Sequence, residues 1–145
     1  MKARVKWVEN ACLVAEAGSG HGVVIDGAPE IGGRNLGVRP MEMMLMGLGG
    51  CTAMDVLSML KKQRQNVTDC VIEVEGTRRD EHPKVFTEIH VHYIITGRDL
   101  KESLVKRAVD LSAETYCSVS QMLGKAAKIT HDYETVEEAN EASHL

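Results

Sequence analysis

The stretch from Met43 to Leu60 carries a single charged residue, Asp55, and it constrains the fold of this chain more than any other feature. Its length is at the lower edge of what a transmembrane helix needs. Its interior glycines and the lack of Trp or Tyr at either end argue against a membrane span. We therefore expect no membrane insertion, and we expect this nearly all-apolar helix to be buried in protein.

The boundaries of this helix are marked by residue types that favour helix ends. Pro40 suits the first helical position, where its missing N–H costs nothing. The helix is predicted to run to Lys61, Lys62 or Arg64, whose charges suit a helix C-terminus. The interior glycines each cost roughly 1 kcal/mol relative to Ala. Such a cost indicates that another backbone or a ligand comes close to this central helix.

Shorter segments with periodic apolar residues precede and follow the predicted central helix in the sequence. Strands are predicted at residues 2–9, 11–15, 21–26, 71–77, 85–96 and 128–133. Helices are predicted from Asp99, with Glu102 completing a capping box, and over residues 116–123. The glycine-rich loop over residues 27–39 is long for a compact domain, which makes it a functional candidate. The pattern predicts an α+β fold with antiparallel sheets packed on the long helix.

One face of the strand at 85–96 is predicted to be buried. Its apolar residues at period two are Val85, Ile89, Val91, Tyr93 and Ile95. In the predicted helix after it, one face is lined by Leu100, Leu104, Ala108 and Leu111.

Length, charge and cysteine content limit the class of protein. The 145 residues are expected to form one domain over residues 1–135, followed by an acidic tail over 136–145 that frays. The net charge of −4 and the lack of a basic face argue against nucleic-acid binding. The N-terminus has no apolar signal region, so we expect a cytoplasmic protein with its four cysteines reduced.

Cys51 lies in the middle of the central helix, directly after two glycines. The ordinary interpretation is a small buried apolar residue. The glycine pair favours a different one, because it leaves room for a substrate or a second chain beside the thiol. Asp55, one turn later, would raise the pKa of that thiol unless a cation such as Arg34 or Arg39 intervenes.

Cys117 is predicted to lie in the first turn of the short helix after residue 115. Free N–H groups and the positive end of the helix dipole favour a thiolate there, so Cys117 is expected to be more acidic than Cys51. The alternative is a buried hinge residue. Cys12 and Cys70 are interpreted as structural. No pair has CxxC spacing, which excludes a thioredoxin-type motif and a zinc knuckle.

The remaining candidate ligands do not predict a metal or another cofactor. His90 and His92 share one face of a strand, but only Glu88 offers a third ligand, and a solvated strand face explains them more simply. The central helix also carries six methionines, which indicate core packing, an adaptable apolar pocket or a subunit interface. A 145-residue chain has little surface to cover such a helix, so dimerisation is expected.

Two cysteine motifs together resemble the OsmC-like family of the OsmC/Ohr superfamily. They are Arg39-Pro40-Met41-Glu42 leading into Met46-Gly47-Leu48-Gly49-Gly50-Cys51, and Tyr116-Cys117-Ser118-Val119. The likeness is strongest to a small bacterial YhfA-type subgroup and covers roughly residues 1–135. It extends to Lys2-Ala3-Arg4-Val5-Lys6-Trp7 and Thr96-Gly97-Arg98-Asp99-Leu100.

This resemblance implies an intertwined homodimer whose active sites lie at the subunit interface. Cys51 would attack an organic hydroperoxide and become a sulfenic acid, and Cys117 would resolve it as a disulfide. This reverses the order of reactivity that the helix-start argument predicts. A thiol reductant of unknown identity would restore the enzyme in oxidative-stress defence. The pocket would be lined by Met44, Leu48, Gly49 and Gly50.

The chain also departs from the active branches of that family. Those branches carry an activating Glu directly after the proline, where this chain has Met41, and the nearest glutamate is Glu42. On a straight helix Glu42 lies about 180° from Cys51. Arg39 and Arg34 are the candidates for the supporting arginine. The alternatives are a binding module that holds a small hydrophobic or electrophilic ligand in the dimer pocket, and a structural dimer with buried thiols.

Overall fold

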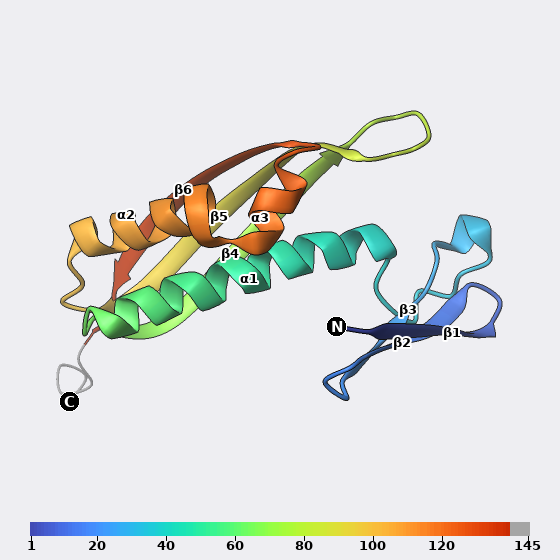
Figure 1. Cartoon of the computed structure of the whole chain (residues 1–145), viewed down its shortest axis with the longest axis horizontal. Helices are drawn as coiled ribbons and strands as arrows, with labels where there is room; N and C mark the ends of the chain where they lie inside the picture. Colours follow the sequence, from blue (N-terminus) through green and yellow to red (C-terminus); the bar gives the residue numbers. More distant parts are fainter. Residues whose placement is uncertain (140–145) are drawn as a thin grey trace. The chain divides into compact units, whose positions relative to one another are not determined.

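The computed structural model describes residues 1–139, which fall into two compact units (Figure 1). The first unit spans Met1–Met44 and the second begins at Leu45. Each unit contains one three-stranded sheet. The α+β class predicted from the sequence is confirmed. The assignment of residues 1–135 to one domain stays a prediction.

The first unit is an antiparallel sheet followed by a loop. Its strands are β1 (Ala3–Glu9), β2 (Cys12–Ala17) and β3 (Gly22–Ile25), paired in that order. The loop after β3 contains one short 3-10 helix, η1 (Pro29–Ile31). The turn into β3 requires a glycine at position 20, whose φ of 89° disfavours other residues. The three predicted strands are therefore confirmed, with small shifts at their ends.

The second unit contains the longer strands. They are β4 (Asn66–Arg78), β5 (Phe86–Arg98) and β6 (Lys128–Glu137), in the order β4-β5-β6. β4 begins earlier than predicted because its polar first residues pair with the end of β5. β6 is also longer than predicted and includes the start of the expected tail. Residues 140–145 of that tail lie outside the described residues.

One pairing in this sheet differs from the prediction of antiparallel sheets. β4 and β5 are antiparallel, but β5 and β6 run parallel. The chain returns between them through α2 (Glu102–Leu111), the π-helical turn η2 (Ser112–Tyr116) and α3 (Ser118–Leu123). A crossover of this length can join parallel strands, whereas a tight hairpin cannot.

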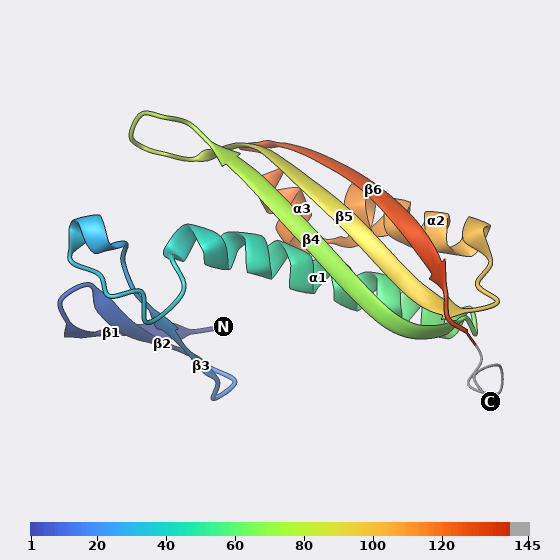
Figure 2. The same ribbon diagram turned by 180° about the vertical axis from the view of Figure 1, so that it is seen from behind.

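The central helix α1 (Pro40–Lys62) has the predicted boundaries. From Leu45 onward it belongs to the second unit, where α1 and α2 lie on the same face of the β4-β5-β6 sheet (Figure 1). Figure 2 shows these strands from the other side, in front of the helices. Leu48, Val56 and Leu60 on α1 are fully buried. They form the helix side of the core in this unit.

The sheet side of this core is the predicted face of β5. Ile89, Val91, Tyr93 and Ile95 are each at most 2% exposed. Val85 is an exception to the predicted face, since it precedes the strand and is 41% exposed. The opposite face of β5, with its two histidines, is partly exposed as predicted.

The other side of α1 is exposed in the single chain, contrary to the expected all-round burial. Met46, Met54 and Leu57 are exposed, and only 22% of the most apolar window of the helix is buried. By length and composition α1 would also pass as a membrane span, but for one helix this is weak evidence. Within the second unit taken by itself, α1 thus carries an apolar stripe that is not covered.

The start of α2 differs from the predicted capping box. Lys101 is the N-cap, without a side-chain capping bond, and Asp99 has a positive φ of 53°. The Asp99 N–H instead donates to the carboxylate of Glu137 on β6. The fully buried residues of α2 are Val105, Ala108 and Val109. Of the stripe predicted to share one helical face, Leu100 precedes the helix, whereas Leu104, Ala108 and Leu111 lie on α2.

Candidate active site

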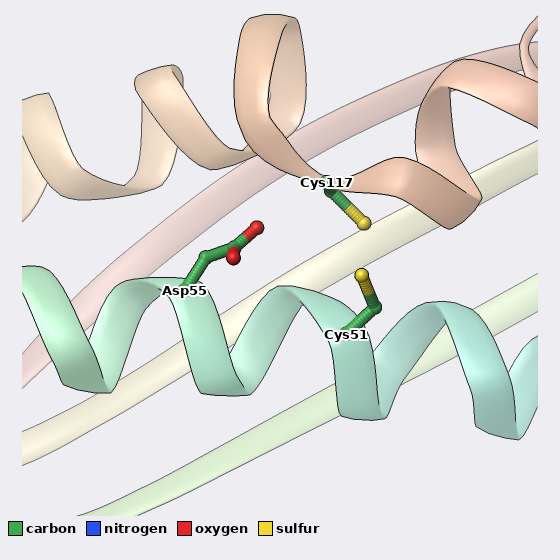
Figure 3. A group of neighbouring side chains, drawn as sticks. All are labelled: Cys51, Asp55 and Cys117. Carbon is green, nitrogen blue, oxygen red and sulfur yellow. The ribbon is translucent and has the colours of Figure 1, made fainter.

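The fold brings together two cysteines that are far apart in the sequence. Cys51 lies in α1, and Cys117 directly precedes α3. Their sulfur atoms point toward one another, with the carboxylate of Asp55 one turn further along α1 (Figure 3). The two sulfurs and one carboxylate oxygen of Asp55 all lie within 4.8 Å of one another. The cysteine pair that the sequence predicts is therefore present within one chain.

Cys117 is held in place by the turn that separates α2 from α3. Its N–H donates to the carbonyl of Ser112 at 2.9 Å, which closes the π-helical turn. Its sulfur accepts hydrogen bonds from the Ser120 N–H at 3.4 Å and from the Thr52 hydroxyl at 3.5 Å. Cys117 is fully buried, whereas Cys51 is half-buried. The more accessible thiol of the pair is thus on α1.

The prediction of an acidic Cys117 thiol is wrong. Cys117 is the N-cap residue of α3 rather than a first-turn residue. Burial raises the pKa of its thiol, and the hydrogen bonds from Thr52 and Ser120 only partly oppose this effect. The nearby Cys51 thiol raises the pKa further. The helix-start argument leaves out the burial of this thiol, which has the largest effect on its pKa.

Polar side chains connect the thiol pair to the core. The Ser112 hydroxyl donates to Oδ2 of Asp55 at 3.0 Å. Tyr93 of β5 is buried beside this group, and burial raises the pKa of its phenol, partly offset by hydrogen bonds with Thr52 and Ser112. Sequence reasoning missed Thr52, Tyr93 and Ser112. Only Thr52 could have been found from the sequence, because it is adjacent to Cys51. Tyr93 and Ser112 come close to the thiols only through the tertiary fold.

A cavity of about 450 Å³ opens beside Asp55, between α1 and α2. Its apolar lining residues are Met59, Leu104, Ala108, Leu111 and Tyr116. Lys62 and Arg107 contribute positive charge to the same lining. The volume lies in the range of small-molecule sites. Leu104, Ala108 and Leu111 of the predicted stripe therefore share one face of α2, the face that lines this cavity.

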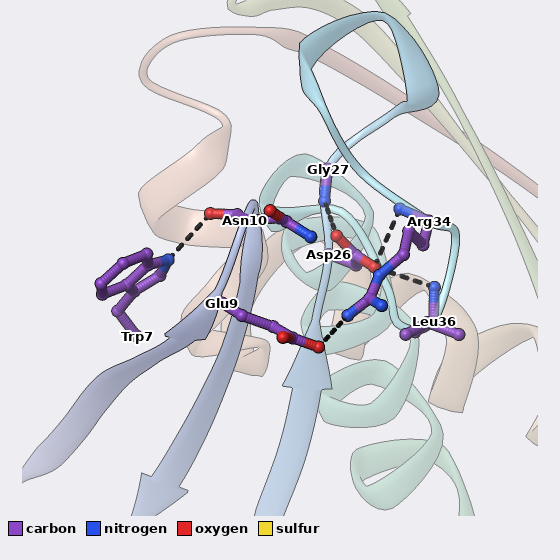
Figure 4. Close-up of polar contacts among 7 residues, drawn as sticks. All are labelled: Trp7, Glu9, Asn10, Asp26, Gly27, Arg34 and Leu36. Carbon is purple, nitrogen blue, oxygen red and sulfur yellow. Dashed lines mark hydrogen bonds and ion pairs between the residues drawn. The ribbon is translucent and has the colours of Figure 1, made fainter.

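Arg34 has a structural role within the first unit (Figure 4). Its guanidinium pairs with the carboxylate of Glu9, and this pairing raises the pKa of Arg34. Its backbone N–H donates to Asp26 at 3.2 Å. The buried Asp26 also accepts N–H bonds from Gly27 and Leu36. Asp26 thereby organises the glycine-rich loop.

Arg39 and Glu42 also have local partners. The Arg39 guanidinium donates to the side chain of Asn35 at 2.9 Å and to the carbonyl of Gly37 at 3.2 Å. Glu42 accepts the backbone N–H of Arg39 at 2.8 Å, which caps the start of α1. A role for Arg34, Arg39 or Glu42 at the thiols stays a prediction.

The four predicted pocket residues have different environments. Leu48 is fully buried, and a Cβ on Gly49 would lie 3.3 Å from the side chain of Val74. Gly50 borders open space, and Met44 is exposed. None of them lines the cavity beside Asp55. Their place in an interface pocket stays a prediction.

The remaining candidates lie away from the thiol pair. Cys12 is buried in the first unit, and Cys70 is half-buried on β4, where burial raises the pKa of its thiol. His90 and His92 both contact Oδ1 of Asp132 on β6, at 2.9 and 2.7 Å. The sequence did not predict this contact because it depends on the parallel pairing of β5 and β6.

This combination of a helix-covered sheet and a close cysteine pair agrees with comparisons to known proteins. The sequence model of the OsmC-like protein family matches residues 32–132. The chain is 53% identical to Protein YhfA of Escherichia coli (strain K12) over 139 residues, which covers 94% of this chain and 98% of that protein. The chain therefore belongs to the OsmC-like family.

Solved structures extend this result to the fold. A hypothetical protein from Aquifex aeolicus VF5 is 30% identical, with a TM-score of 0.83 over 95% of this chain and 97% of that one. The organic hydroperoxide resistance protein OhrB of Bacillus subtilis is 17% identical, with a TM-score of 0.62 over 92% of this chain and 98% of that one. At that identity the second likeness shows the fold alone.

Proposed function

We propose that this protein is a cysteine-dependent peroxidase that reduces organic hydroperoxides. The observation that carries the proposal is the pairing of Cys51 and Cys117, whose sulfurs lie within 4.8 Å of each other. A further support is the fold shared with OhrB of Bacillus subtilis, which is an organic hydroperoxide resistance protein. Cys51 takes the role of the attacking thiol because it is the more accessible of the two.

The proposed reaction has two steps on the protein and one that restores it. The Cys51 thiolate attacks one oxygen of the hydroperoxide, the O–O bond breaks, and the alkoxide leaves as an alcohol after taking a proton. Cys117 then gives up its proton and its sulfur attacks the sulfenic sulfur of Cys51. The S–O bond of Cys51 breaks, and the hydroxide takes this proton and leaves as water as the disulfide forms. A thiol reductant of unknown identity, acting in the cytoplasm, returns both residues to thiols.

The surroundings of Cys117 suit a resolving thiol. Burial raises the pKa of its thiol, which disfavours direct attack of Cys117 on the hydroperoxide. The Thr52 hydroxyl and the Ser120 N–H stabilise negative charge on its sulfur when it attacks Cys51. Arg34 and Arg39 remain our candidates for stabilising the departing alkoxide.

A homodimer forms part of this proposal. Met54 of α1 is 75% exposed, and Met46 and Leu57 share the same uncovered side of the helix. A contiguous exposed stripe of this kind is typical of an interaction surface. A second copy of the chain would cover it and bring further residues near Cys51.

The second candidate function is a binding module without turnover. It is supported by the cavity beside Asp55. Its apolar walls and its two positively charged side chains, Lys62 and Arg107, suit a small amphipathic or electrophilic ligand. The binding module is also favoured because the glutamate follows the proline by two positions, at Glu42, and Met41 stands where the active branches carry it. This function requires no disulfide between Cys51 and Cys117.

A thiol count before and after one equivalent of cumene hydroperoxide separates the two functions. For the reduced wild type we expect two of the four free thiols to be lost together, with peptide mapping showing a Cys51–Cys117 disulfide. Cys117→Ser should accumulate a trappable sulfenic acid on Cys51. Cys51→Ser should not react.

Cys70→Ser is the matched control, because it removes a half-buried thiol outside the pair. It should react like the wild type. If the wild type keeps all four thiols under these conditions, the peroxidase proposal is wrong. A ligand that co-purifies with the wild type would then favour the binding module.

A further inference from the structure

The group formed by Cys51, Cys117 and Asp55 has the composition of a metal site. Its two sulfurs and one carboxylate oxygen lie within 4.8 Å of one another (Figure 3). Around a tetrahedral Zn²⁺, with bonds of about 2.0–2.3 Å, ligand atoms are separated by roughly 3.3–3.8 Å. Small side-chain movements would therefore bring all three atoms into coordination distance.

The atoms around this group would support bound ligands. The Ser112 hydroxyl donates to Oδ2 of Asp55 and leaves the other carboxylate oxygen available. The Thr52 hydroxyl and the Ser120 N–H both donate to the Cys117 sulfur. Outer hydrogen bonds of this kind orient metal ligands and tune their affinity for the ion.

The site also has an open side. Asp55 lines the cavity of about 450 Å³ between α1 and α2, so an ion and its water can approach the carboxylate from there. Three protein ligands with one position left for water is a common arrangement for zinc. Thiolates favour zinc over magnesium or calcium, which prefer oxygen ligands.

Asp55 is the residue that the proposed peroxide reaction does not use. Its carboxylate lies within 4.8 Å of both sulfurs, and Asp55 also lines the cavity between α1 and α2. Two cysteine sulfurs and one carboxylate oxygen at this spacing form a ligand set that one zinc ion can share.

We propose that the reduced protein binds one Zn²⁺ per chain through Cys51, Cys117 and Asp55, with water as the fourth ligand. Each thiol loses a proton on binding, and no electron is transferred. A disulfide between the two cysteines uses both sulfurs, so zinc and the disulfide exclude each other. This site goes beyond the proposed function, since zinc binding does not require any reaction with peroxide.

The test is a titration of the reduced wild type with Zn²⁺ by calorimetry, repeated with Co²⁺ to record thiolate–metal absorption. We expect one ion per chain. Asp55→Asn should weaken the affinity at least ~10-fold, by analogy with the cost of losing metal-site partners. Cys51→Ser should abolish both the binding and the thiolate absorption.

The matched control is Asp110→Asn. Asp110 forms another possible ligand group with Glu114 and His131, so it tests whether the ion binds there instead. The proposal requires wild-type affinity in Asp110→Asn. Circular dichroism checks the fold of each variant, and protection of Cys51 from alkylation by Zn²⁺ tests the site in the unaltered chain.

Three results would overturn the proposal: no zinc binding by the reduced wild type, undiminished affinity in Cys51→Ser, or loss of binding only in Asp110→Asn. The hydroperoxide assay is done on zinc-free protein. Failure of the zinc site is thereby distinguished from failure of the peroxidase reaction, because either can occur while the other result stands.

Discussion

The two units of this chain both contain a three-stranded sheet, but they bury their side chains very differently. In the second unit, α1 and α2 cover one sheet face, and the inward side chains of β5 are almost inaccessible. In the first unit, every residue of β1 is exposed. Trp7 and Val5 are 63% and 57% exposed.

This difference shows that similar sheets can be stabilised by different interactions. The second unit has an apolar core, whose burial contributes roughly 25 cal/mol per Å². The first unit buries few apolar side chains, among them Cys12 and Ile25, and its loop donates three hydrogen bonds to the buried Asp26. Its exposed apolar side chains contribute only if another surface covers them, which agrees with the proposed homodimer.

The largest effect is expected from the core of the second unit. Leu60→Ala should lower the free energy of unfolding by about 2–5 kcal/mol, because it leaves a cavity under α1. Denaturant unfolding measures this change. Leu57→Ala on the same helix is the control, since Leu57 is 40% exposed and should cost much less in the monomer. Equal losses in both variants would contradict this description of the core.

The next largest effect concerns the exposed sheet of the first unit. Trp7→Ala should weaken the proposed dimer by about 2 kcal/mol, the typical cost of removing an interface Trp. Sedimentation over a range of protein concentrations measures it. Trp7→Phe keeps most of the apolar area and should retain most of the affinity. An unchanged dimer constant in Trp7→Ala would place the interface elsewhere.

A smaller, pH-dependent effect is expected at Asp26. Although burial opposes it, the N–H bonds from Leu36, Arg34 and Gly27 lower the pKa of this carboxyl. Its contribution to stability is therefore present above the ordinary Asp pKa of about 3.9 and lost as the pH falls through the folded value.

Asp26→Asn should accordingly be less stable than the wild type at neutral pH, and the difference should shrink in acid. Thermal unfolding across this pH range measures the change, and limited proteolysis of the loop at 27–39 locates it. A difference that stays constant with pH would show that the charge of Asp26 does not hold the loop.

The smallest effect is expected on the exposed face of the second sheet. The contact with Asp132 raises the pKa of His92 and lowers that of Asp132. The His92 contribution is present below its ordinary pKa of about 6.5 and lost as the pH rises through the folded value. His92→Gln should therefore lower the free energy of unfolding only slightly, and only at acidic pH. NMR titration and thermal unfolding measure this change. A large loss at alkaline pH would contradict it.

Much of the local structure was predictable from the residues. Pro40 and the basic residues after Leu60 mark the ends of α1 correctly, because helix ends have strong local preferences. The alternation in β5 correctly predicted its buried face. Asp99 was misleading, because its N–H pairs with Glu137, a residue distant in the sequence.

The candidate site was predictable only in part. The two motifs containing Cys51 and Cys117 indicated a reactive pair, but Thr52, Tyr93 and Ser112 had no comparable signal. The helix-start rule gave the wrong direction for the pKa of Cys117, because a local rule does not include the burial imposed by β5 and α1.

The sequence by itself determined the class of fold and the central helix, since these depend on periodicity and helix-end preferences, and its family resemblance pointed to Cys51 and Cys117 as the candidate pair. Only the tertiary structure decided the parallel pairing of β6, the cavity beside Asp55 and the close approach of the carboxylate to both thiols. These features depend on how α1, α2 and η2 pack on the sheet. Packing joins residues whose separation along the chain contains no information about their contact.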